Sequence, residues 1–154
     1  MRRILALAAL AFTLMLAASS LHAQAQFGIA LPFKTEGSDI GLEGRVDIPI
    51  GSVRGLSITP NVSFFFVEFG TFFTIDGNVH YTVVPSSGKG NNGLYVLGGL
   101  DLGVASYGGV TNNEIGLNLG GGYKGDIGAV DLFGELKFVV GNFDTIVLTG
   151  GIYF

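Results

Sequence analysis

The chain has 154 residues, enough for one domain, and only 13% of them are charged. A typical soluble domain carries about 25% charged residues, so this composition argues against a soluble surface. The chain has no cysteine and a net charge of −4, which exclude disulfides, thiolate metal sites, an N-terminal lipidated cysteine and a basic nucleic-acid-binding surface.

The first segment has the three parts of a secretory signal peptide. Arg2 and Arg3 form a positive start, residues 4–18 are predominantly apolar, and residues 19–25 are mostly small or polar. Cleavage is expected after Ala23 or Ala25, so we predict a signal peptide over 1–23 and a mature domain over 24–154. An uncleaved membrane anchor is the alternative interpretation.

From residue 26 onward apolar side chains recur at every second position, the period of a β-strand. Glycine-rich and polar turns separate the apolar runs. The predicted strands are about 26–34, 39–50, 55–68, 72–84, 93–106, 113–124, 129–140 and 145–154. The bulky face of the first pair of strands, for example, carries Phe27, Ile29, Leu31, Ile40 and Leu42.

The sizes of the two faces indicate which one points inward. An eight-stranded barrel has a lumen just wide enough for side chains to fill, and the apolar face is too bulky for it. The other face is small and polar, with many glycines, so the bulky face is expected to contact lipid. In hydrocarbon only helices and closed barrels satisfy every backbone group. The sequence therefore predicts an all-β fold, an eight-stranded antiparallel up-and-down transmembrane β-barrel.

Aromatic residues gather near both predicted ends of the strands, as in the interfacial girdles of membrane barrels. Those expected near the end that holds the chain termini are Phe27, Tyr81, Tyr123 and Phe154. Those expected near the other end are Phe33, Phe66, Phe73 and Phe138. The alternative is that aromatic residues simply favour strands.

The segments 116–123, 132–138 and 147–154 carry a family resemblance. The sequence there resembles the outer-membrane β-barrel domain family of small porin-like bacterial proteins. The chain end, with Ile146, Leu148, Ile152 and Phe154, looks like the assembly signal of that family. The resemblance implies insertion into the outer membrane of a Gram-negative envelope by the barrel assembly machinery. The connections opposite the termini are short (35–38, 69–71, 107–112 and 141–144), unlike the long loops common in the family.

Charged residues and one histidine are predicted on the inward face. They are Glu43, Arg45, Asp47, Asp76, His80, Asp101, Glu114, Asp131, Glu135 and Lys137. Because isolated buried charges are costly, a plug of paired charges is the favoured interpretation, and a polar pore lining is the alternative. Arg45 and Lys137 are taken as the only mid-strand cations.

Several local patterns suggest chemistry but have simpler explanations. Asp76 and His80 share a strand face with Ser63 nearby, yet four residues of strand separate them by roughly 13 Å. The GxGxxG match at 120–125 is followed by no helix. We therefore expect no catalytic residue, no metal and no cofactor. A structural envelope role is favoured, with a narrow solute pore, a lipid-modifying barrel enzyme and a soluble periplasmic barrel as alternatives.

Overall fold

A computed structural model of the chain describes residues 25–68, 70–86, 91–108, 110–141 and 144–154. The predicted signal peptide and one of its two cleavage sites, Ala23, lie outside these residues. The strands are β1 (Gln26–Lys34), β2 (Asp39–Pro49), β3 (Leu56–Phe66), β4 (Thr71–Pro85), β5 (Gly93–Tyr107), β6 (Val110–Asp126), β7 (Asp131–Gly141) and β8 (Thr145–Tyr153).

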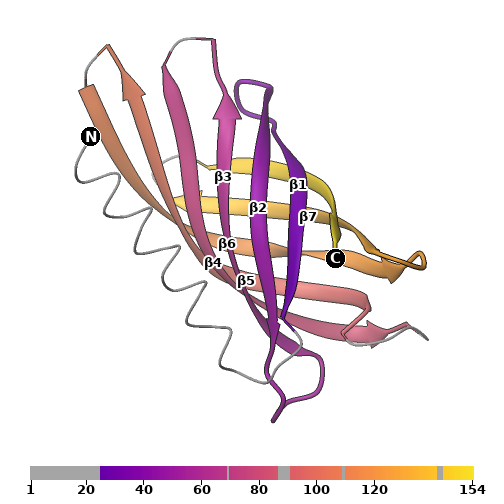
Figure 1. The fold of residues 1–154 in the computed structure, drawn as a ribbon. Coiled ribbons are helices and arrows are strands. Elements are labelled where there is room, and N and C mark those ends of the chain that lie inside the picture. Colours follow the sequence, from indigo (N-terminus) through magenta and orange to yellow (C-terminus); the bar gives the residue numbers. More distant parts are fainter. Residues whose placement is uncertain (1–24, 69, 87–90, 109, 142–143) are drawn as a thin grey trace.

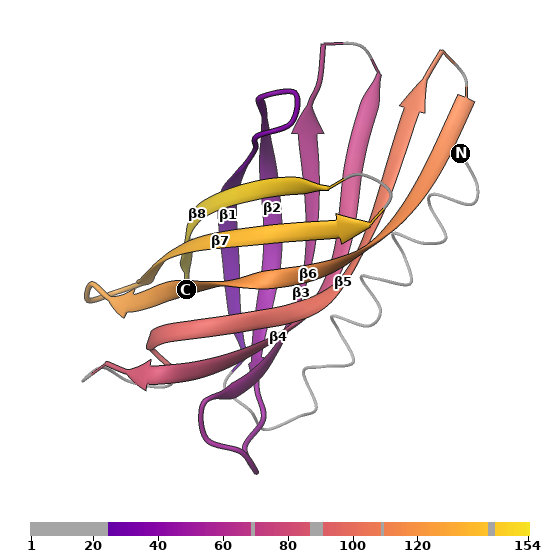
Figure 2. The same ribbon diagram turned by 180° about the vertical axis from the view of Figure 1, so that it is seen from behind.

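Each strand pairs with the next in an antiparallel manner, and β8 pairs with β1 to close the barrel. Figures 1 and 2 show that β1–β3 run steeply across β7 and β8, on two sides of the same closed sheet. The predicted fold class, a closed eight-stranded antiparallel meander, is confirmed. No helix in the described part of the chain is long and apolar enough to cross a bilayer.

The predicted strand positions hold to within a few residues, and the largest difference lies in β6. This strand spans Val110–Asp126, whereas the sequence predicts 113–124. Tyr107 of β5 pairs directly with Val110, so most of the connection expected over 107–112 is strand instead. The longer ladder also places Lys124 inside the sheet, opposite Gly93.

The alternation predicted from the sequence matches the two faces of the barrel. Bulky residues on the outer face are exposed, up to 62% at Leu31 and 69% at Ile115. Val46 is an exception, on the outer side by register but only 4% exposed. The predicted interfacial aromatics are all exposed or partly exposed: Phe27, Phe33, Phe66, Phe73, Tyr81, Tyr123, Phe138 and Phe154.

The inner face combines aromatic and polar side chains with glycine. Phe65, Tyr95, Phe133 and Tyr153 are at most 5% exposed, as the inward register requires. Such aromatic packing needs small neighbours, because the lumen of an eight-stranded barrel is narrow. The core of this protein is therefore its lumen, which also holds the buried charged residues.

Candidate functional site

The centre of the lumen is organised around the guanidinium group of Arg45 on β2. Its Nη2 lies 2.5 Å from Glu43 Oε1, and its Nη1 lies 3.1 Å from Glu135 Oε2 on β7. The side chains of all three residues are 1–2% exposed. The Tyr95 hydroxyl donates a hydrogen bond of 2.8 Å to Glu135, and the ring of Phe133 lies 4.2 Å from the guanidinium carbon. Arg45 is thus bound by Glu43 on its own strand and by Glu135 and Phe133 of β7 across the lumen.

A second cation, Lys137 on β7, is bound to the carboxylate of Asp76 on β4. Its Nζ lies 2.9 Å from Asp76 Oδ1, and both side chains are almost fully buried. Asn118 on β6 donates to the same oxygen at 2.6 Å and to Asn78 Oδ1 at 2.9 Å. This cluster joins β4, β6 and β7 across the barrel.

A third buried ion pair involves Lys124, which the sequence analysis missed. Its Nζ lies 2.6 Å from Asp47 Oδ2, and Lys124 is 5% exposed. Thr59 donates a hydrogen bond of 3.0 Å to the other oxygen of Asp47. The expectation of only two mid-strand cations is therefore wrong, because β6 continues past residue 124. The signal in the sequence that could have identified it is the two-residue alternation. Because Tyr123 is on the outer face, the next residue, Lys124, belongs on the inner face.

The remaining predicted lumen residues are less tightly paired. His80 stacks on the ring of Tyr95, with centroids 4.7 Å apart, and its Nε2 lies 3.8 Å from Glu135 Oε2. Asp131 accepts hydrogen bonds from Gln26 at 2.7 Å and Asn92 at 2.9 Å.

The side chains considered for nucleophilic chemistry have other partners. Ser63 donates a hydrogen bond of 2.8 Å to Glu43, Asp76 is bound to Lys137, and His80 is stacked on Tyr95. No cluster of three or more His, Cys, Asp or Glu residues in the described ranges is arranged to hold a metal ion.

Glycines on the inner face make room for the lumen aromatics. A Cβ atom on Gly122 would lie 2.5 Å from the Tyr95 hydroxyl oxygen, and one on Gly28 would lie 2.8 Å from the ring of Tyr153. On Gly151 it would lie 2.7 Å from the ring of Phe133. These glycines therefore make room for the aromatic side chains of the lumen.

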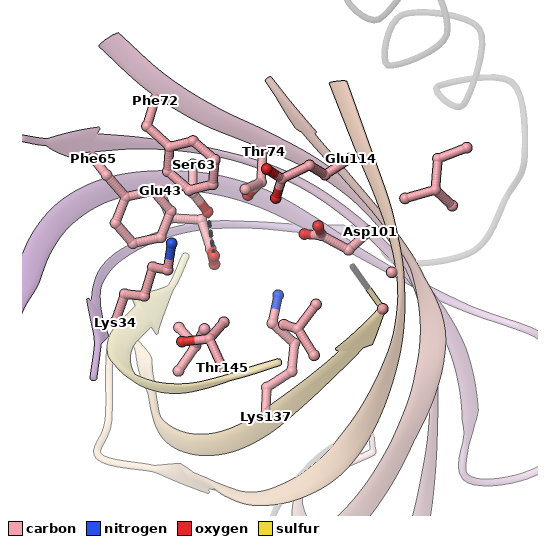
Figure 3. A pocket seen from close by; sticks show the side chains of 15 residues that line it. Lys34, Glu43, Ser63, Phe65, Phe72, Thr74, Asp101, Glu114, Lys137 and Thr145 are labelled. Atoms are coloured by element: carbon pink, nitrogen blue, oxygen red, sulfur yellow. Dashed lines mark hydrogen bonds between the residues drawn. The ribbon is translucent and has the colours of Figure 1, made fainter. Parts of the chain in front are cut away.

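Two small cavities occupy the lumen on either side of the Arg45 network. The loop-end cavity, near the ends of the strands opposite the termini, measures about 40 Å³ and is bounded by Glu43 and Lys137, among others (Figure 3). The terminal-end cavity measures about 10 Å³ and is bounded by Asp47, His80 and Lys124, among others. The two cavities share no lining residue, and neither is lined by the guanidinium or carboxylate of the Arg45–Glu135 pair.

No family model and no curated protein matches the sequence. Among solved structures, the N-terminal β-barrel domain of Pseudomonas aeruginosa OprF matches with a TM-score of 0.62 and 14% identity, over 84% of this chain and 95% of that chain. The chain has the fold of a bacterial outer-membrane β-barrel. Neisserial surface protein A also matches, with a TM-score of 0.48, 16% identity, and coverage of 84% of this chain and 92% of that chain. At this identity the match to OprF establishes the barrel fold alone.

Proposed function

We propose that the protein is an integral outer-membrane barrel with a closed lumen, serving a structural role in the envelope and not the passage of solutes. The observation that carries this proposal is the layer of ion pairs formed by Arg45, Glu43 and Glu135. It lies between two cavities that share no lining residue. A lumen filled in this way lacks a continuous water path.

Planar-bilayer recordings test whether the lumen is closed. We expect no stable current steps from the purified wild-type barrel. The double variant Arg45→Ala/Glu135→Ala removes both ends of a cross-lumen pair and should admit measurable current. Uniform steps from the wild-type protein would favour the alternative function, a narrow pore for small solutes or ions.

The proposed location rests on the outer face of the barrel. That face presents large apolar side chains from all eight strands, including Leu31, Phe66, Leu100 and Ile115 at 59–69% exposure. Membrane barrels expose such a band to lipid. We propose outer-membrane lipid as the surrounding partner, with export through the N-terminal segment and insertion by the barrel assembly machinery. Recovery of the mature protein in the soluble periplasmic fraction would contradict this location.

A non-catalytic role is part of the same proposal. Within the Arg45 network, the groups that could act as acids, bases or nucleophiles are engaged with one another. Ser63, for example, donates to Glu43, and Glu43 in turn binds Arg45. Partners of this kind stabilise buried charge, which is the role expected of a plug.

A further inference from the structure

The loop-end cavity contains charged groups that the ion pairs of the plug do not use. Asp101 on β5 is only 7% exposed and lines this cavity, as does Glu114 on β6. Asp101 stands directly opposite Asp76 in the β4–β5 ladder, and the ammonium of Lys137 is bound to Asp76. No cation of the described residues forms an ion pair with Asp101 or Glu114. A buried carboxylate without a cation is costly, so this wall calls for a positive group.

The opposite wall of the cavity supplies a cation that is also unused. Lys34, at the end of β1, lies with its Nζ 4.4 Å from the centre of the Phe72 ring, and it forms no ion pair within the described part of the chain. Figure 3 shows Lys34 reaching into the cavity from the side across from Asp101 and Glu114. Glu43 and Lys137 also line the cavity, but they are paired with Arg45 and Asp76. Among the described residues, the lining charges without an ion pair are therefore Lys34 on one wall and Asp101 and Glu114 on the other.

A further polar group points to a ligand at the same place. The Thr145 hydroxyl on β8 lines the cavity, and its oxygen is buried without a hydrogen-bond partner among the described residues. Buried hydroxyls normally have a partner, because an unsatisfied one loses its hydrogen bonds to water. A hydroxyl can donate to a carboxylate or accept from an ammonium group. Thr145 could thus complete the contacts of a ligand held between the two walls.

We propose that the loop-end cavity binds a small zwitterion, an ammonium and a carboxylate group joined by a short carbon chain, as in an α-amino acid. Asp101 and Glu114 face the ammonium group, and Lys34 faces the carboxylate. The cavity of about 40 Å³ has room for about three waters. Glycine is therefore the best-fitting member of the class, and larger side chains would have to extend toward the mouth. This site requires no conduction through the plug, so its test is independent of the bilayer recordings.

Calorimetric titration of the refolded barrel in detergent micelles tests the proposal. The probes are glycine, ethylammonium chloride and sodium acetate at matched ionic strength. We expect glycine to bind with one-to-one stoichiometry and at least tenfold more tightly than either single-charge probe. Asp101→Asn and Lys34→Gln should each weaken glycine binding at least tenfold. The matched control Glu36→Gln changes an exposed turn carboxyl outside the cavity and should leave binding unchanged.

The same titrations give the results that would overturn the proposal. Absence of saturable glycine binding to folded wild-type protein would overturn it. Ethylammonium binding as tightly as glycine, with no effect of Lys34→Gln, would replace the zwitterion site with a simple cation site. Folding of each variant is checked by heat-dependent gel migration. If Asp101→Asn fails to fold, Glu114→Gln replaces it, and unchanged glycine affinity in that variant would count against the assigned negative wall.

Discussion

Arg45 and Glu135 are joined across the lumen by a 3.1 Å ion pair, although they are 90 residues apart and their strands are not neighbours in the sheet. β2 and β7 are separated by β1 and β8, so this contact ties together parts of the barrel that share no backbone ladder. Since Arg45 also binds Glu43, one cation serves two buried carboxylates.

We expect Arg45→Ala to lower the urea midpoint of the refolded barrel. The change leaves Glu43 and Glu135 buried without their cation, and breaking a buried pair costs on the order of 3–5 kcal/mol. Arg54→Ala is the matched control, because Arg54 is exposed in the turn after β2. Equal midpoints for the two variants would mean that lumen water solvates the carboxylates.

A double-mutant cycle on Lys137 and Asp76 should show strong coupling. Lys137→Met leaves the Asp76 carboxylate unpaired, whereas Lys137→Met/Asp76→Asn removes both charges. Replacing a whole buried pair is often neutral, while removing one partner is strongly destabilising. We expect the double variant to recover most of the stability lost by Lys137→Met, measured by urea unfolding. Additive losses would show that the 2.9 Å contact contributes little to folding.

The fold could be predicted from the sequence because alternation is a local property. Strand identity, the inward or outward face of each residue and barrel closure all follow from the two-residue period and from the size of the side chains. Phe65 and Tyr153, for example, occupy inward positions of the alternation and are 3% and 2% exposed.

The partners within the lumen could not be predicted in the same way. A pair such as Arg45–Glu135 depends on the register of every intervening strand, and a single sequence does not determine that register across the barrel. Lys124 was missed for a related reason, because strand ends depend on ladder pairing beyond the apolar run. Likewise, only the three-dimensional structure shows which charged residues form ion pairs in the plug and which line the loop-end cavity without an ion pair among the described residues.

Alanine substitutions at one glycine of the inner face and one of the outer face should have different effects on the stability of the barrel. A Cβ on Gly122 would meet the backbone carbonyl oxygen of Gly134 and the Tyr95 hydroxyl oxygen. A Cβ on Gly134, on the outer face, would meet no atom of the described residues within 4 Å. Overpacking costs typically about 1–3 kcal/mol, so Gly122→Ala should lower the urea midpoint. Gly134→Ala should be neutral or slightly stabilising, because alanine loses less backbone entropy than glycine on folding. Matching midpoints would refute the tight packing around Gly122.

Deletion of Phe154 should impair barrel assembly more than export. Phe154 exchanges two backbone hydrogen bonds with Phe27, at 2.8 and 3.3 Å, next to the β1–β8 seam. Its side chain is 64% exposed and follows Ile146, Leu148 and Ile152 on the outer face. Phe154→Ala keeps the backbone bonds and removes only the ring. If the ring is the assembly signal, both variants should reach the periplasm and accumulate there unassembled, scored by heat-dependent gel migration. Normal assembly of Phe154→Ala alone would assign the effect to barrel closure instead.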